Sequence, residues 1–218
     1  MTQTAGPTAA LAGVPTGLQA QGLWLGRRQL FVRFAAEAET ATMYTASAIA
    51  QELKRGASRS RFHSISIGGR DPVMYVQFLQ EALSAGTPPL PVMLNVDGQR
   101  PEAMEPLKKQ VALVQVTLES AMFDVHIERA LATIRAVADA GLEHAMVLAP
   151  GDQTSDGQML RIVEQTHGAS AKSVLIIHPP IGTPVDRDRR WVSLLERAAT
   201  VHPDARLSLR LPPPTGTR

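Results

Sequence analysis

The chain of 218 residues contains no cysteine. This absence excludes disulfide bonds, thiolate zinc sites and iron–sulfur clusters held by cysteine. Long apolar runs are also missing, since none approaches the roughly 20 residues that a helix needs to cross a bilayer. The first residues lack the basic start and the long apolar centre of a secretory signal. We therefore expect a cytoplasmic protein that has no membrane partner.

An excess of charge of one sign is lacking as well. The 22 Lys and Arg residues stand against 20 Asp and Glu residues, which gives a formal net charge of +2. Without a long basic block, the composition does not imply a nucleic-acid partner. The short cluster Arg187, Arg189 and Arg190 alternates with Asp186 and Asp188, a mixture typical of a solvated helix start.

From Leu23 onward, short apolar runs alternate with helical patterns about six times. We expect one α/β domain over residues 22–211, between a flexible arm (1–21) and a flexible tail (212–218). Strands are predicted within 23–34, 62–67, 90–96, 111–118, 143–150 and 173–180, with a last strand as an option at 205–211. Helices are predicted at 41–53, 73–83, 102–110, 124–141, 158–168 and 186–202. We expect Gly56 to end the first of these helices.

Apolar strands that alternate with amphipathic helices indicate a parallel sheet covered by helices. Right-handed crossovers leave two fold classes, an open doubly wound sheet and a full or partial barrel. No glycine-rich dinucleotide fingerprint follows the first strand, which weakens a nucleotide-binding open sheet. From the residues alone, both classes stay open.

In either class, ligands bind beyond the carboxyl ends of the strands. Polar residues at the strand exits are Glu37 and Glu39, then Gly68, Gly69, Arg70 and Asp71, then Asn95 and Asp97, then Glu119 and Ser120, then Asp152, and finally His178. Each of them could instead serve only to form a turn, because turns favour such residues for backbone reasons. Asp71 would then be a helix cap before Pro72, and Asp97 part of a turn.

Gly68 and Gly69 are the most informative backbone feature. Two glycines after a strand permit a positive φ and a close approach of a ligand to the main chain. A tight turn explains them equally well. His178 ends a very apolar strand and is the most specific single candidate, although a lone histidine there is more often a hydrogen-bonded structural residue than a base. No metal-ligand spacing is found among the other histidines, His63, His126, His144, His167 and His202.

The succession "FVRF", "SISIGGRDP", "LPVMLNVDG", "VALVQVTLES" and "SVLIIHPP" resembles the radical S-adenosylmethionine superfamily. The nearest types are the 7-carboxy-7-deazaguanine synthases and the glycyl-radical-enzyme activases. The resemblance spans roughly residues 25–211 as a series of landmarks. It implies a partial (β/α)6 barrel of the TIM type. In that family a CxxxCxxC loop binds a [4Fe-4S] cluster, and a GGEP-like motif holds the amino group of S-adenosylmethionine.

Carried over to this sequence, the three cysteines would fall near Glu37, Ala41 and Tyr44, none of which is a thiolate. The GGEP-like site corresponds to Gly68, Gly69 and either Arg70 or Asp71. The resemblance also implies that Asn95 and Asp97 lie near the cofactor, and Glu119 and Ser120 near its ribose. Without its cysteines the loop cannot hold the cluster, so radical generation is not expected. S-adenosylmethionine binding remains an option, and no other cofactor is implied.

Three functional hypotheses follow. The first is a cluster-free pseudoenzyme, a scaffold that binds a small molecule or a partner protein. The open edge of a partial barrel would need covering by the chain ends or by a second subunit, and the second alternative would give a homodimer. The second is a non-radical enzyme for a small polar metabolite, with acid–base residues among Asp71, Asp97, Glu119, Asp152 and His178. The third is that the resemblance reflects only shared βα architecture.

Overall fold

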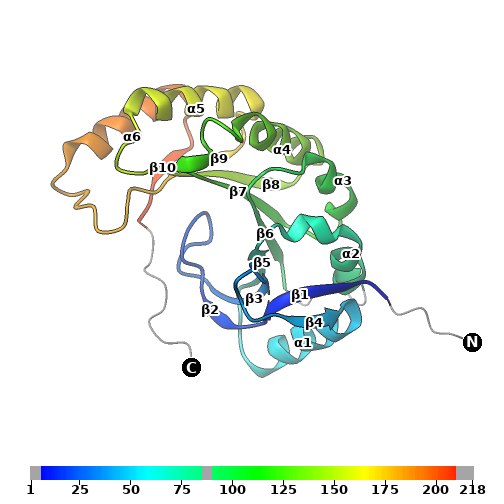
Figure 1. The fold of residues 1–218 in the computed structure, drawn as a ribbon. Coiled ribbons are helices and arrows are strands. Elements are labelled where there is room, and N and C mark those ends of the chain that lie inside the picture. Colours follow the sequence, from blue (N-terminus) through cyan, green and yellow to red (C-terminus); the bar gives the residue numbers. More distant parts are fainter. Residues whose placement is uncertain (1–5, 85–89, 210–218) are drawn as a thin grey trace, which may run out of the picture.

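The computed structural model describes residues 6–84 and 90–209, which form a mixed sheet flanked by helices (Figure 1). Seven of its strands run parallel, each beside the next one in the sequence. They are β3 (Arg28–Phe34), β5 (Ser64–Gly69), β6 (Val92–Val96), β7 (Leu113–Glu119), β8 (Glu143–Ala149), β9 (Val174–Ile177) and β10 (Ala205–Leu207). A doubly wound sheet reverses its strand order at a switch point. This order has no reversal, and the sheet is not closed.

Three antiparallel strands extend the β3 edge. They are β1 (Thr8–Gly13), β2 (Thr16–Leu18) and β4 (Thr42–Thr45). β1 and β2 pair with different halves of β3, and β4 pairs with β1 at the outer edge. This departs from the expected flexible arm, because Ala9 and Leu11 of β1 are fully buried in the core. The expected tail at 212–218 lies outside the described residues.

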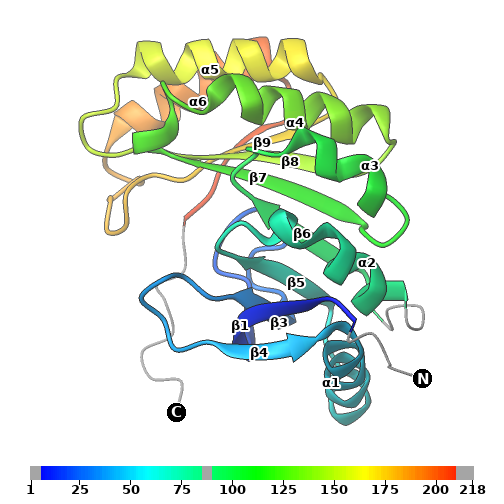
Figure 2. The same ribbon diagram turned by 45° about the vertical axis from the view of Figure 1, so that its right-hand side comes forward.

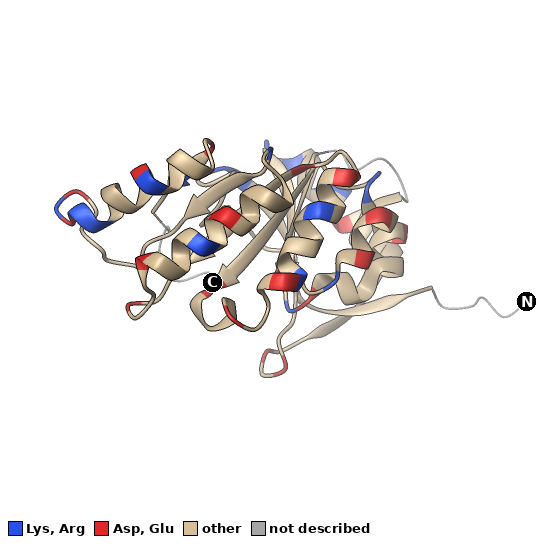
Figure 3. Cartoon of the chain, turned by 90° about the horizontal axis from the view of Figure 1, so that it is seen from above, with Lys and Arg blue, Asp and Glu red and all other residues tan. Residues whose placement is uncertain are grey.

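The helices lie on the outer face of the sheet, as Figures 1 and 2 show. The α-helices are α1 (Ala46–Arg59), α2 (Val76–Ser84), α3 (Met104–Leu107), α4 (Ile127–Asp139), α5 (Asp156–Ala169) and α6 (Arg189–Val201). Short 3₁₀ turns are η1 (Pro72–Tyr75), η2 (Pro101–Ala103) and η3 (Ser120–Met122). Both signs of charge are distributed along the outer helices in Figure 3. No helix in the described ranges is long and apolar enough to cross a membrane.

The first predicted helix is wrong at both ends. Residues 42–45 form β4, and the helix begins at Ala46 behind the N-cap Thr45, whose hydroxyl accepts from the Ala48 amide. The helix also continues through Gly56 to Arg59. A Cβ at Gly56 would come within 2.9 Å of the Leu30 side chain. This glycine therefore serves the close packing of α1 on β3 and does not end the helix.

Side chains alternate between the two faces of each parallel strand, as the strand geometry requires. Leu30, Val32 and Phe34 of β3 point into the main core beneath the helices. The opposite, inner face carries polar side chains in its β3–β7 half, among them Gln29, Ser66 and Gln115. In the β8–β9 half it is apolar, with a small cluster formed by Ala145, Val147, Val174 and Ile176. The inner face is where the unusual contacts of this protein lie.

Candidate functional site

Two adjoining hollows open at the carboxyl ends of β5 and β6. Their volumes are about 240 and 420 Å³, and both are lined by Gln21, Gly69 and Asn95. Asp71, Asp97 and Thr117 line the smaller one. The larger one adds Phe31, Arg33, Ser66, Gly68 and residues 15–20. We call the two hollows together the rim cavity.

Five of the residues singled out in the sequence thus line one cavity, namely Gly68, Gly69, Asp71, Asn95 and Asp97. The two glycines differ in their roles. Gly69 has φ +98°, and a Cβ there would lie 2.2 Å from the Phe34 carbonyl oxygen. Gly68 is free of that constraint, because a Cβ would meet only Asn95, at 3.5 Å. Gly69 is therefore required by the backbone, whereas the missing side chain of Gly68 leaves space in the cavity.

Asp71 does not cap the following turn, contrary to the expectation. Its backbone adopts the left-handed conformation at φ 37° and makes no side-chain cap bond. Instead, Oδ2 accepts a 2.9 Å bond from Arg100 Nε. The other carboxylate oxygen, Oδ1, is buried without a hydrogen-bond partner. Asp71 lines the smaller hollow, so its carboxylate places a negative charge, paired with Arg100, at the cavity wall.

Asn95 is held by a chain of side-chain amides. Its Nδ2 donates to Ser66 Oγ at 2.9 Å, and its Oδ1 accepts from Gln115 Nε2 at 2.9 Å. Gln115 Oε1 in turn accepts from the main-chain N–H of Leu23 at 3.0 Å. Asp97 plays the turn role that its sequence context predicts, since its Oδ1 accepts from the Gln99 amide at 3.0 Å.

Residues 19–27, here called the hairpin loop, connect β2 to β3 and cross the inner face of the sheet (Figure 1). Leu23 packs against the small apolar cluster on β8 and β9. The N–H of Gly22 donates to His178 Nε2 at 3.0 Å, and His178 Nδ1 donates to the Ser208 carbonyl at 2.7 Å. His178 is therefore a neutral imidazole that ties the loop to the end of the sheet.

The remaining strand-exit candidates lie apart from the rim cavity. Glu119 at the end of β7 and Ser120 after it are exposed, as is Asp152 after β8. A Cβ at Gly151 would come within 3.0 Å of Ser120 Oγ, so Ser120 borders the β8 loop. His178 uses both ring nitrogens within the protein. The acid–base set of the enzyme hypothesis is thus spread over the sheet edge.

The segment aligned with the cluster loop has a different construction. Glu37 lies in an exposed turn and forms an ion pair with Arg70, which lowers the pKa of the Glu37 carboxyl and raises that of the Arg70 guanidinium. Glu39 forms a second ion pair, with Arg33. Ala41 has no donor, and Tyr44 lies within β4, packed against the core. These residues do not fit an iron–sulfur cluster. Within 6–84 and 90–209, no group of three or more His, Asp or Glu could hold a metal ion.

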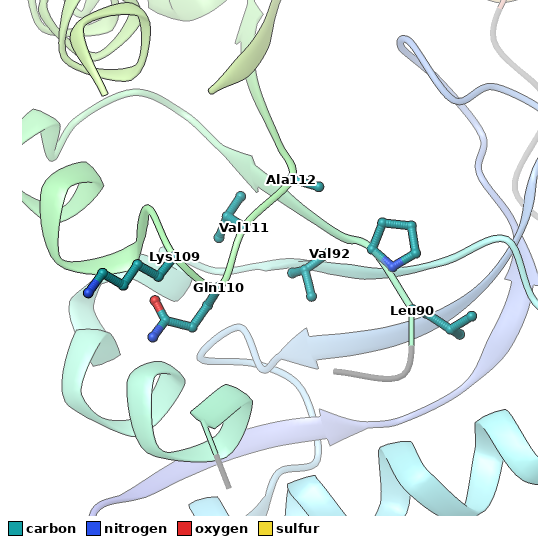
Figure 4. Close-up of a pocket in the computed structure, with 7 residues that line it drawn as sticks. Leu90, Val92, Lys109, Gln110, Val111 and Ala112 are labelled. Atoms are coloured by element: carbon teal, nitrogen blue, oxygen red, sulfur yellow. The ribbon is translucent and has the colours of Figure 1, made fainter. Parts of the chain in front are cut away.

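A further hollow of about 310 Å³ lies at the opposite edge of the sheet, before β6 and β7 (Figure 4). Lys109 is the single charged residue among the seven that line it. The others are Gln110 and the apolar residues Leu90, Pro91, Val92, Val111 and Ala112. Because polar groups do not converge on it, this hollow is a poor candidate for a site.

The chain is similar to a 7-carboxy-7-deazaguanine synthase from Methanothermobacter thermautotrophicus. The two are 32% identical, and the match covers 44% of this chain and 44% of that protein. Less than half of the relative's length is therefore represented. No family model matches the chain. The partial match supports the resemblance to radical S-adenosylmethionine proteins, and the absence of cysteine agrees with a degenerate cluster site.

Sequence reasoning missed Gln21, Gly22, Ser66 and Gln115. One signal was available, because Gln115 is a buried polar residue in the middle of β7, on the face opposite Val114 and Val116. A polar residue buried there needs partners. The partners themselves could not be named, since the hairpin loop was assigned to the arm and to the strand that follows it.

Proposed function

We propose that this chain is a cluster-free protein of the radical S-adenosylmethionine type, that its open sheet is a partial barrel, and that it binds a small polar ligand in the rim cavity without generating radicals. The ion pair between Glu37 and Arg70 carries this proposal. The resemblance would place a cluster thiolate near Glu37, and the acid of the GGEP-like motif at Arg70 or Asp71. A pair of opposite charges joins the two loops in which the family would place iron and cofactor.

The rim cavity supplies the binding groups. The Asp71 carboxylate at the cavity wall would attract an ammonium group of the ligand, and Gly68 leaves room beside Asn95. Asp97 adds a second carboxylate. These groups suit the amino-acid end of S-adenosylmethionine, whose sulfonium and amino groups are both positive. With no iron to hold that end, these polar contacts and the cavity walls would supply the binding energy.

The hairpin loop supports binding over catalysis. It occupies the inner face of the sheet and uses both His178 and Gln115 as acceptors. The most pointed candidate base is thereby engaged in holding the structure. The ligand space that is left lies at the rim, bounded on one side by Gln21 of the same loop.

Anaerobic reconstitution with iron and sulfide tests the cluster-free part of the proposal. We expect iron below stoichiometric amounts after desalting and no charge-transfer absorption in the visible range. Cysteine is the usual ligand of such clusters. A stable cluster spectrum with about four irons per chain would show that other residues hold a cluster, and it would overturn the proposal.

A further inference from the structure

Two stretches of sequence without an acidic residue meet at the amino ends of β3 and β5. Residues 1–36 and 53–70 together hold eight of the 22 Lys and Arg residues and none of the 20 Asp and Glu residues. The fold joins them through the His63 main-chain N–H, which donates to the Arg28 carbonyl at 2.8 Å. Trp24 packs edge-on against the His63 ring, with centroids 4.9 Å apart.

The Arg28 guanidinium marks the centre of this surface. It donates to Ser60 Oγ at 2.7 Å and lies 4.6 Å from the centre of the Phe62 ring. Ser60 follows Arg59 and precedes Arg61, and both of these arginines are exposed. We define the basic surface as Arg27, Arg28, Arg59 and Arg61 together with Trp24, Phe62 and His63.

The positive charge of the basic surface is not neutralised locally. None of its four arginines forms an ion pair with a carboxylate of residues 6–84 or 90–209. Several other arginines of the molecule do form an ion pair with a carboxylate, as Arg190 does with Asp156. Burial lowers the pKa of His63, and the charge of Arg27 lowers it further. The carboxyl end of α1 and the Phe62 ring stabilise the arginines in part.

We propose that the basic surface binds single-stranded nucleic acid. Guanidinium groups bind phosphate in a bidentate manner, and all four cations are arginines. The half-buried rings of Trp24, Phe62 and His63 lie among them, and aromatic side chains beside cations are what unpaired bases stack on. An acidic protein, the alternative partner, would pair with the arginines, but its binding would not explain the three aromatic rings among them. None of the residues of the basic surface lines the rim cavity, so this proposal does not rest on the ligand proposed there.

The test is a fluorescence anisotropy titration of the full chain with a labelled 12-nucleotide oligouridylate at several salt concentrations. Neutralising four phosphates on a single strand predicts a slope of log K against log salt of about −3. The double variant Arg59→Gln/Arg61→Gln should reduce the slope to about half and weaken binding at least about tenfold at low salt. The matched control Arg187→Gln/Arg189→Gln removes the same charge from another exposed site and should change little.

Other outcomes would overturn the proposal. One is a dissociation constant weaker than about 100 µM even at low salt. Another is equal weakening by the two double variants, which would indicate net charge alone. Competition by a polyglutamate peptide as effective as the oligonucleotide would assign the surface to an acidic protein. Circular dichroism of each variant checks that the fold is retained.

Discussion

The main-chain N–H of Gly22 donates a 3.0 Å hydrogen bond to Nε2 of His178, across 156 positions of the sequence. Together with the bond from Leu23 to Gln115, it fixes the hairpin loop against the inner face of the sheet. The loop in turn forms one wall of the rim cavity through Gln21. The shape of the rim cavity therefore depends on hydrogen bonds to His178 and Gln115, two residues that do not line it.

Replacing His178 tests this dependence. In His178→Ala the buried Gly22 N–H and Ser208 carbonyl lose their partner, and an imidazole-sized space is left, so we expect a loss of about 2–4 kcal/mol in the free energy of unfolding. Urea denaturation measures the loss. His126→Ala, at a half-buried histidine that makes no cap bond, is the control and should cost much less. An equal loss in the free energy of unfolding for the two variants would contradict the role of His178 in fixing the hairpin loop.

Gly22 and Gly26 form a matched pair in the same loop. Both have positive φ, at +84° and +75°. A Cβ at Gly22 would lie 1.8 Å from Gln115 Oε1, whereas a Cβ at Gly26 meets nothing within 4 Å. We expect Gly26→Ala to cost about 1 kcal/mol from backbone strain, and Gly22→Ala about 2–4 kcal/mol because Gln115 must also move. Similar midpoints in thermal denaturation for the two variants would contradict the position of the loop.

Substitutions at the two glycines of the rim cavity distinguish a glycine that the backbone conformation requires from one that leaves room for a ligand. Gly69→Ala would drive a Cβ to 2.2 Å from the Phe34 carbonyl oxygen, so we expect a loss of at least about 2 kcal/mol in stability. Gly68→Ala makes an ordinary contact with Asn95 and should fold with a change below about 1 kcal/mol. Only the second variant reports on ligand binding, which it should weaken by filling the cavity. Calorimetric unfolding and ligand titration of both distinguish the effects.

The histidines predict how stability changes with pH. Burial lowers the pKa of His202 below its usual 6.5, although the bond that its Nε2–H donates to the Ser173 carbonyl acts in the opposite direction, and burial lowers that of His63 as well. Below pH 6.5 the unfolded chain takes up these protons first, so stability is full above 6.5 and falls as the pH drops toward the folded-state pKa. Urea midpoints between pH 7.5 and 5 should therefore decrease.

His202→Gln should flatten that decrease, because the amide keeps a donor toward Ser173 without titrating. A profile unchanged by the substitution would assign the pH dependence to other groups. Arg70 lowers the pKa of Glu37, so this ion pair stabilises the fold above the ordinary carboxyl pKa of 4.5 and its contribution is lost as the pH falls below that value.

The parallel strands could be predicted because many of their central residues are apolar and β-branched, as Val174, Ile176 and Ile177 of β9 are, and because glycines and prolines follow several of them. The glycines and acids at the strand exits could likewise be placed at one sheet edge. Their gathering into one cavity was a consequence of the parallel order.

The hairpin loop could not be predicted from local sequence. Gly22 resembles any turn glycine, and Gln115, against which it packs, and His178, to which its N–H donates, lie 93 and 156 positions away. The prediction that Gly56 ends the helix was wrong for the same reason, because this glycine serves a contact with Leu30, which is distant in the sequence. Arg27 and Arg59 are unremarkable in the sequence, and only the pairing of β3 with β5 brings their neighbourhoods together.

Isothermal titration with S-adenosylmethionine, methionine and 5′-deoxyadenosine tests the central claim most directly. Asparagine adopts the left-handed backbone readily, so Asp71→Asn removes the charge without straining the turn. Asp152→Asn, exposed and outside the cavity lining, is the control. The account predicts that S-adenosylmethionine binds without iron, that Asp71→Asn weakens it about tenfold or more, and that Asp152→Asn leaves it unchanged. No heat of binding with any of the three probes, or equal affinity of the Asp71→Asn variant, would contradict it.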